Sequence, residues 1–273
     1  MSAIGARDVA YDHDGTEMIG MLVAPEGAAA LPAVLLFHDA FGLGELAIEW
    51  AHEYAALGYA VFAADVWGGR RQPSTVDEIG PLIGAMANDR ARWHARAAAA
   101  LAAARSLPEI DARRVAAVGY CFGGSTALEL LRIGADLRGV VSVHGGLDLL
   151  EPGWHAARRD ASVLVCTGAD DPMATEAQRR TLVDGLDSAG LDWQVDLYSG
   201  TKHAFTNPAV PRAAQHPVLG YNARSARRAW LSTERLLAEV LRDDGVDPDG
   251  APLARAGHPT PTTSPNDERK THS

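Results

Sequence analysis

The segment that decides the fold is Val115-Ala-Ala-Val-Gly119-Tyr120-Cys121-Phe122-Gly123-Gly124, in which an apolar run passes into a Gly-x-Cys-x-Gly sequence. A helical pattern follows directly, so the segment predicts a sharp turn from a strand into a helix. Glycines two residues before and after the central position remove the Cβ atoms that would clash in such a turn. The turn exposes the side chain of Cys121 at the end of the strand, which makes this thiol a candidate nucleophile.

The start of the following helix supports the same interpretation. The backbone N–H of Phe122 lies at a helix N-terminus, where amides are unpaired and the helix dipole favours negative charge, including a thiolate. Two alternatives stay open at this point. Cys121 is either a nucleophile or a strand-end cysteine whose glycines serve only helix packing, and Ser125 on the first helical turn is a rival nucleophile.

The sequence on either side of this segment alternates short apolar runs with longer amphipathic stretches. A hairpin is predicted first, with strands at Ala6–Tyr11 and Glu17–Ala24. The later runs predict strands at Pro32–Phe37, Ala60–Ala64, Val115–Val118, Gly139–Val143, Ser162–Cys166 and Trp193–Leu197. Helices are predicted at Glu45–Leu57, Val76–Leu107, Gly124–Ile133, Thr175–Ala189 and Asn222–Leu241. This order predicts an α/β fold with a mostly parallel sheet, helices on both faces, and functional residues at the carboxyl ends of strands.

The chain divides by composition near residue 242. Residues 1–242 predict one catalytic domain, which is an ordinary size for an α/β enzyme. Residues 243–273 contain five of the 15 prolines and no aromatic residue, so they predict a disordered C-terminal tail.

Charge and cysteine content exclude several classes of protein. Lys and Arg number 25 and Asp and Glu 35, which gives a net charge of −10 and leaves no basic footprint for nucleic acid or an anionic membrane. The two cysteines, Cys121 and Cys166, lie in apolar runs and predict free thiols in a reducing compartment. With no apolar stretch of 18 residues and no secretory signal, the chain is expected to be cytoplasmic. Cys166 is interpreted as a small buried strand residue.

A nucleophile needs a base and an acid that orients the base, and later strand ends provide both in the expected order. The segment Val163-Leu-Val-Cys-Thr-Gly168-Ala-Asp170-Asp171-Pro172 ends a strand with two candidate acids. We favour Asp171, because the following proline biases it to extended geometry, and assign Asp170 to turn formation or capping. His203 follows the next strand in a glycine-containing loop and is the predicted base.

Four motifs carry a family resemblance over about residues 8–241. They are His38-Asp39-Ala40-Phe41-Gly42-Leu43, Gly119-Tyr-Cys121-Phe-Gly-Gly124, Gly168-Ala-Asp-Asp171-Pro172 and His203-Ala-Phe-Thr-Asn-Pro208. The chain resembles the dienelactone hydrolases, a branch of the α/β-hydrolase fold. The resemblance implies Cys121 as nucleophile, His203 as base and Asp171 as its orienting acid. It also implies an oxyanion hole formed by the amides of Ala40 and Phe122, and places Asp39 where the family carries a glutamate near the thiol. The alternative for Asp39 is that it only caps its own loop.

Substrate recognition departs from the family pattern. Dienelactone-cleaving members hold a substrate carboxylate with two arginines. Arg70 and Arg71 are candidates for the first, although they can equally be a solvated surface pair, and Asn207 stands at the second position. Half of the clamp is therefore missing. The candidate pocket walls, which can equally be core residues, are Trp67, Phe41, Tyr120 and Phe205.

His38, His144 and His203 all follow predicted strands, but they are not accompanied by an i, i+4 histidine pair or a Cys/His cluster. We therefore expect no metal site and no cofactor, and interpret His144 as a hydrogen-bonded wall of the pocket. The predicted function is hydrolysis of a small ester or lactone through a cysteine thioester acyl-enzyme. The alternative is a non-catalytic binder of a small carbonyl compound. The expected partner is the small-molecule substrate, and the expected assembly is a monomer or a homodimer.

Overall fold

The computed structural model describes residues 3–210 and 216–242 of the chain. The tail predicted for residues 243–273 lies outside these described residues. None of the described helices combines the length and apolar character needed to cross a membrane.

One sheet organises the described residues, with the strand order β1-β2-β4-β3-β5-β6-β7-β8. Its six parallel strands are β3 (Leu31–Phe37), β4 (Ala60–Ala64), β5 (Ile110–Tyr120), β6 (Gly139–Val143), β7 (Ser162–Gly168) and β8 (Asp192–Tyr198). The hairpin of β1 (Ile4–His13) and β2 (Thr16–Pro25) joins the edge of β4 antiparallel. The predicted mostly parallel sheet and the predicted N-terminal hairpin are therefore confirmed.

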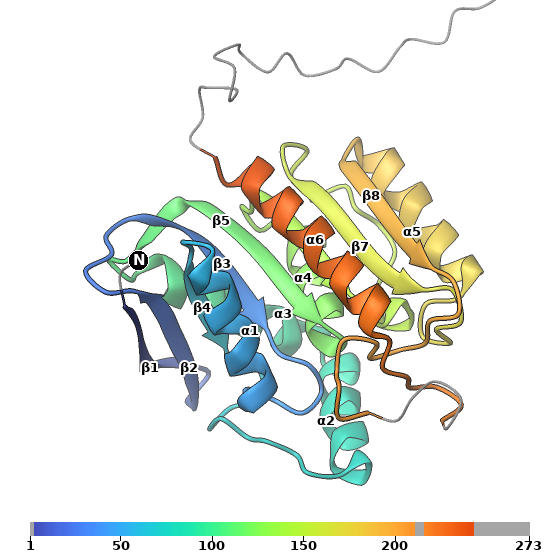
Figure 1. The fold of residues 1–273 in the computed structure, drawn as a ribbon, viewed down its shortest axis with the longest axis horizontal. Coiled ribbons are helices and arrows are strands. Elements are labelled where there is room, and N and C mark those ends of the chain that lie inside the picture. The colour runs from blue at the N-terminus through green and yellow to red at the C-terminus, as the bar shows by residue number, and fades with distance from the viewer. Residues whose placement is uncertain (1–2, 211–215, 243–273) are drawn as a thin grey trace, which may run out of the picture. The chain divides into compact units, whose positions relative to one another are not determined.

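Helices cover both faces of the sheet (Figure 1). Helices α1 (Glu45–Ala56) and α6 (Ala223–Val240) pack on one face, where β3 contributes Val34 and Leu36. The other face is covered by α3 (Arg90–Arg105), α4 (Phe122–Arg132) and α5 (Glu176–Ala189), and there β3 contributes Leu35 and Phe37. Successive strand residues point to opposite faces, so a strand covered on both sides reads as a continuous apolar run.

The predicted helix Val76–Leu107 is wrong in one respect, because the structure divides it. Helix α2 spans Val76–Asn88, α3 begins at Arg90, and Asp89 between them has φ −128° and ψ 73°. The Asp89 side chain accepts a hydrogen bond from the Arg92 amide and so caps the second helix. A carboxylate N-cap that satisfies a first-turn amide favours a new helix start over continuation, and helical propensity alone does not register this.

Candidate active site

The predicted sharp turn is present at the carboxyl end of β5. Cys121 has φ 53° and ψ −120°, and α4 begins at the next residue. A Cβ atom on Gly119 would lie 1.9 Å from the carbonyl oxygen of Gly123, and one on Gly123 would lie 2.3 Å from the carbonyl oxygen of Phe37. The two glycines are therefore required by backbone contact, and the turn holds Cys121 in a strained left-handed conformation.

The structure brings together the three residues predicted as nucleophile, base and acid. The Cys121 Sγ lies 3.1 Å from Nε2 of His203. The other ring nitrogen of His203, Nδ1, lies 2.9 Å from Oδ2 of Asp171. The side chains of His203 and Asp171 are buried, whereas Cys121 is half-buried and accessible to a reactant. One imidazole thus joins a thiol and a carboxylate, which is the arrangement that nucleophilic catalysis requires.

The charge state of His203 follows from its two partners. Burial opposes the protonated ring, but the negative charge of Cys121 and the Asp171 carboxylate outweigh this effect and raise the pKa of His203 to about 10. At neutral pH the ring is therefore an imidazolium, and its Nε2–H can stabilise negative charge on the sulfur 3.1 Å away.

The structure distinguishes the two adjacent acids of the β7–α5 loop. Asp171 contacts His203 through Oδ2 and accepts a hydrogen bond from the Met173 amide through Oδ1 at 2.8 Å. Asp170 is exposed, and its amide donates to the carbonyl of Thr201. Asp171 is therefore held by the backbone in the position of an orienting acid, and Asp170 is not.

The two amides expected to form an oxyanion hole are unpaired. Within the described part of the chain, neither the amide of Ala40 nor that of Phe122 donates a hydrogen bond. The Ala40 loop is held by His38, whose Nδ1–H donates to the Asp39 carbonyl at 2.6 Å and whose Nε2 accepts from the Val66 amide at 3.2 Å. Both free donors are thus available to developing negative charge.

Asp39 lies in the same loop, where its Oδ1 accepts the Phe41 amide at 2.9 Å. Among the described residues, no hydrogen bond joins its carboxyl group to Cys121. Burial raises the pKa of Asp39 to about 6, against the opposing effects of the Phe41 amide and the charge of His203. Asp39 therefore caps its own loop near His203, which agrees with the loop-capping alternative.

Among the predicted pocket walls, Trp67 and Phe41 lie at the oxyanion loop. Trp67 donates from Nε1 to the Ala40 carbonyl at 3.3 Å, and its ring stacks on Phe122 with the ring centroids 4.6 Å apart. Phe41 is 39% exposed, which is high for a large apolar side chain. Trp67 therefore supports the loop, and Phe41 offers an accessible apolar surface beside it.

The structure does not support Tyr120 and Phe205 as pocket walls. Both side chains are buried in the core between the sheet and the α1/α6 layer. The ring of Tyr120 stacks on Trp50, and its hydroxyl bonds with that of Tyr54 at 2.8 Å. Successive residues along a strand point to opposite faces of the sheet, so the side chain of Tyr120 lies on the other face from that of Cys121. Tyr120 instead lines a cavity of about 550 Å³ between α1 and α6.

The arginine clamp is only partly assembled. Arg70 pairs with Asp8 of β1 at 2.7 Å, and its amide donates to Asp65. Arg71 is exposed, and its carbonyl lies against Gly42 next to the oxyanion loop. Asn207 is buried, and its Oδ1 accepts the Ala209 amide at 2.9 Å, so it stabilises its own turn. Of these three residues, Arg71 alone presents an exposed charged group.

Ser125 and His144, two further residues considered from the sequence, occupy different positions relative to Cys121. Ser125, the rival nucleophile, is fully buried and donates to the Gly146 carbonyl at 2.8 Å. His144 contacts the backbone of Cys121 directly, because its Nδ1 accepts a hydrogen bond from the Cys121 amide at 3.1 Å. His144 was predicted from the sequence as a hydrogen-bonded wall of the pocket, but its two partners, the Cys121 amide and the Thr206 hydroxyl, were not. The signal for this contact in the sequence was a histidine at the end of the strand that lies next to β5.

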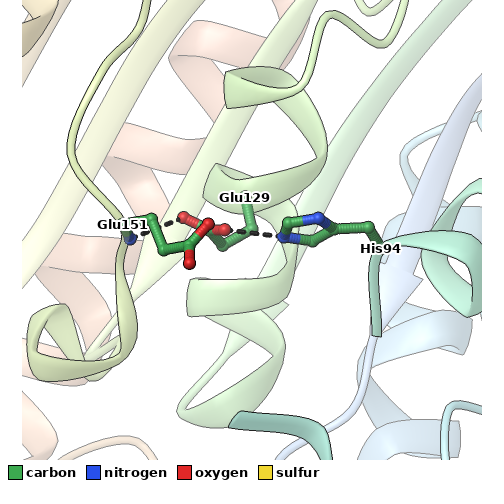
Figure 2. Close-up of side chains that lie close together, drawn as sticks. All are labelled: His94, Glu129 and Glu151. Atoms are coloured by element: carbon green, nitrogen blue, oxygen red, sulfur yellow. Dashed lines mark hydrogen bonds and ion pairs between the residues drawn. The ribbon is translucent and has the colours of Figure 1, made fainter. Parts of the chain in front are cut away.

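A second cluster of titratable side chains is formed by residues of α3, α4 and the segment between β6 and β7 (Figure 2). His94 Nε2 lies 2.7 Å from Glu129 Oε2, and Glu151 donates its amide to Glu129 Oε1 at 3.1 Å. Arg132 binds both oxygens of Glu129 at 2.7 Å and also Glu151. Burial opposes the charge of Glu129, but these hydrogen bonds hold its pKa below the usual range. Because the guanidinium occupies the carboxylate oxygens, the cluster fits an ion-pair network better than a metal site.

Comparison with known proteins identifies the family. The sequence matches the model of the dienelactone hydrolase family over residues 18–241. A protein of Caenorhabditis elegans described as uncharacterised is 30% identical over 158 residues, covering 57% of this chain and 99% of its own length. A Synechocystis protein named "Putative carboxymethylenebutenolidase" is 22% identical over 247 residues, covering 86% of this chain and 96% of its own.

A solved structure extends the likeness to three dimensions. The crystal structure of a dienelactone hydrolase-like promiscuous phosphotriesterase from metagenomic libraries superposes with a TM-score of 0.83 at 38% identity. The match covers 88% of this chain and all of that one. The resemblance inferred from the four motifs and the α/β-hydrolase fold are thereby confirmed. The chain belongs to the dienelactone hydrolase family, whose members are carboxylic ester hydrolases.

Proposed function

We propose that this hydrolase cleaves a small ester or lactone through a covalent thioester on Cys121. The observation that carries the proposal is the continuous line of contacts from Cys121 Sγ through the His203 ring to Asp171, at 3.1 and 2.9 Å. In this proposal Cys121 is the nucleophile, His203 carries the proton, and Asp171 fixes the orientation of the ring.

In the first half of the reaction, the Cys121 thiolate attacks the substrate carbonyl carbon and a C–S bond forms. The electron pair of the C=O bond moves to oxygen, where the amides of Ala40 and Phe122 stabilise the negative charge. When this intermediate collapses, the bond from carbon to the alcohol oxygen breaks. The His203 imidazolium gives its proton to that oxygen, and a thioester remains.

In the second half, His203 acts as a base. Thioester formation removes the thiolate charge that is the main cause raising the pKa of His203, so its pKa moves back toward the ordinary range. The neutral ring then accepts a proton from water as the water oxygen attacks the thioester carbon. The C–S bond breaks, the carboxylic acid leaves, and the thiolate and imidazolium are restored.

We propose Arg71 as the group that meets a carboxylate on the substrate, if the substrate carries one. Arg71 is exposed beside the oxyanion loop, whereas Arg70 is engaged by Asp8 and Asn207 by its own turn. A single arginine gives weaker discrimination than a two-arginine clamp. The proposed substrate range therefore includes esters and lactones without a free carboxylate.

Trapping of the acyl-enzyme tests the mechanism against a non-catalytic binder of carbonyl compounds. The wild-type protein and Cys121→Ala are each incubated with a slowly hydrolysed aryl ester and measured by intact-mass spectrometry. A mass increase equal to one acyl group, located at Cys121 and absent from the variant, supports the proposal. An active Cys121→Ala protein, or an adduct at another residue, contradicts it, and the absence of any adduct or turnover favours a binder.

Phosphotriester cleavage is a second candidate activity, favoured by the 38% identity to a promiscuous phosphotriesterase. The same thiolate and amide donors would act at phosphorus in place of carbon. An aryl phosphotriester with a chromogenic leaving group tests it in parallel with the matching aryl ester. Loss of both activities in Cys121→Ala would assign them to one site.

Two further expectations belong to this proposal. We propose a cytoplasmic protein, supported by two free cysteines, Cys121 and Cys166, and a monomer or homodimer that acts on a small molecule. Fractionation of the native host and size-exclusion chromatography with light scattering test the compartment and the assembly.

A further inference from the structure

His144 is a buried titratable residue for which the proposed reaction cycle has no proton-transfer step. It follows β6 directly, is 1% exposed, and has φ 41°, which is unusual for a residue with a side chain. Its ring lies edge-on to that of His203, with the centroids 5.3 Å apart, and also edge-on to that of Phe205. A histidine held in a left-handed conformation inside the core indicates that its ring position is fixed by specific partners.

The two ring nitrogens of His144 have different partners. The Cys121 backbone amide lies 3.1 Å from Nδ1 of His144 and also donates to the Val143 carbonyl at 3.0 Å. A backbone amide can only donate, so Nδ1 carries no proton. The proton of the neutral ring is therefore on Nε2, which donates to Oγ1 of Thr206 at 2.7 Å.

The neutral form is also the one that the surroundings favour. Burial and the positive charge of His203 hold the pKa of His144 well below its usual range. A proton on Nδ1 would remove the acceptor for the Cys121 amide and place two cationic rings side by side. The Nε2–H tautomer is thus the form that satisfies both partners.

Thr206 belongs to the loop that carries His203, and Cys121 belongs to the turn that ends β5. One ring therefore connects the backbone of the residue at the nucleophile position to the loop that positions the base. We propose that His144 is a positioning residue that fixes the distance between Cys121 and His203 by bridging the Cys121 amide and the Thr206 hydroxyl. This inference rests on the proposed roles of Cys121 and His203.

Three substitutions separate positioning from simple packing. His144→Phe keeps a buried ring but removes both hydrogen bonds. His144→Asn offers Oδ1 near the position of Nδ1, and asparagine tolerates positive φ, so it restores the contact with the Cys121 amide. Thr206→Val keeps the shape of the side chain and removes only the hydroxyl that accepts from Nε2. Each protein is assayed for kcat and KM on an aryl ester, and its thermal stability is measured separately.

We expect His144→Phe to lower kcat about 100-fold with KM nearly unchanged, because misplacement by about 1 Å has an effect of this size. His144→Asn is expected to recover about tenfold of that loss, a difference of about 1.4 kcal/mol in barrier height. Thr206→Val lowers kcat in the wild-type background but has no further effect beside His144→Asn, which cannot reach Thr206.

Two results would overturn the inference: a wild-type kcat in folded His144→Phe, or equal kcat losses in His144→Phe and His144→Asn. If His144→Phe fails to fold, an unchanged kcat in Thr206→Val overturns it. Failure of the underlying mechanism is distinguishable, because it appears as retained activity in Cys121→Ala whatever the His144 variants show.

Discussion

The Sγ atom of Cys121 lies 3.1 Å from Nε2 of His203, with the thiol half-buried and the imidazole almost wholly enclosed. The sharp turn after β5 and the loop after β8 are 82 residues apart in sequence and meet at this contact. The turn holds the thiol at a helix N-terminus, and the loop holds a ring whose charge is balanced by Asp171. The fold therefore brings the thiol and the imidazole into contact although the chain separates them.

The first prediction concerns the thiol. Cys121→Ser places a hydroxyl at the same position, but this group is neutral at neutral pH and must lose its proton during the attack. We expect kcat on an aryl ester to fall at least about 100-fold, the lower range of what assisted proton transfer contributes. Cys166→Ala is the matched control, because Cys166 is a buried thiol in β7 and its removal is expected to leave kcat unchanged. Equal activities of the two variants would contradict the assignment.

The two adjacent aspartates give a second prediction. Asp171→Asn keeps the size of the side chain but removes the negative charge 2.9 Å from His203, so the ring loses its orienting partner. A loss of about 10⁴-fold in kcat is expected, as for the acid of a Ser-His-Asp triad. Asp170→Asn changes an exposed neighbour and is expected to retain the wild-type rate. Steady-state assays of both proteins measure the difference, and a comparable loss in Asp170→Asn would rule out this division of roles.

The raised pKa of His203 predicts how kcat/KM changes at alkaline pH. In the free enzyme the charge of Cys121 and the Asp171 carboxylate raise the pKa of His203 to about 10 against the effect of burial. In the proposed mechanism this proton passes to the departing alkoxide, so kcat/KM for an alkyl ester should fall as the pH rises through about 10. Removing the Asp171 charge lowers the pKa of His203, so the alkaline limb of Asp171→Asn should shift to lower pH. A limb that does not move in this variant would show that His203 is not the group that titrates.

Local patterns predicted the sheet from sequence more accurately than they predicted side-chain partners. The bounds of β4 and β6 were predicted to the residue, because both strands are buried on both faces and read as uninterrupted apolar runs. Cys121, Asp171 and His203 were placed together because strand ends of a parallel sheet lie at one edge.

The remaining features depend on tertiary contacts. The pairing of Arg70 with Asp8 requires knowing that β1 lies near the β4–α2 loop, and the His144 contact requires knowing that β6 lies next to β5. Tyr120 was misplaced because a residue beside a nucleophile in sequence faces the other side of the sheet. These are relations between distant segments, which periodicity and spacing do not encode.

The raised pKa of Asp39 predicts that the free energy of unfolding falls as the pH rises toward 6. Burial raises its pKa to about 6 in the folded chain, above the 3.8 of an unperturbed aspartate. Between these values the folded chain holds a proton that the unfolded chain releases, so this carboxyl lowers stability as the pH rises toward 6, with no further change above it. Asp39→Asn keeps the acceptor for the Phe41 amide but cannot ionise. Its stability advantage should therefore grow by about 1.4 kcal/mol from pH 5 to pH 8, because the wild-type penalty increases over about one pH unit in this range.

Urea unfolding at the two pH values measures this difference, with Asp170→Asn as the control for a general change of charge. A stability gap between wild type and Asp39→Asn that is the same at pH 5 and pH 8 would contradict a raised pKa at Asp39.

The glycines give a final prediction, with a matched pair in one chain. A Cβ atom on Gly119 would lie 1.9 Å from the Gly123 carbonyl oxygen, which belongs to the backbone of the sharp turn and cannot move aside. Gly119→Ala must displace the first turn of α4 and with it Cys121, so we expect a loss of more than about 3 kcal/mol, in the range of severe overpacking. Gly84 lies in α2, and apart from its chain neighbours and its own helix backbone a Cβ atom there meets nothing within 4 Å. Gly84→Ala should therefore stabilise the chain by about 0.5–1 kcal/mol, because alanine loses less backbone entropy in a helix. Chemical denaturation of both variants measures the contrast. A mild effect of Gly119→Ala, comparable in size to that of Gly84→Ala, would mean that the turn at Cys121 tolerates a side chain at this position and is less tightly constrained than the contact distances require.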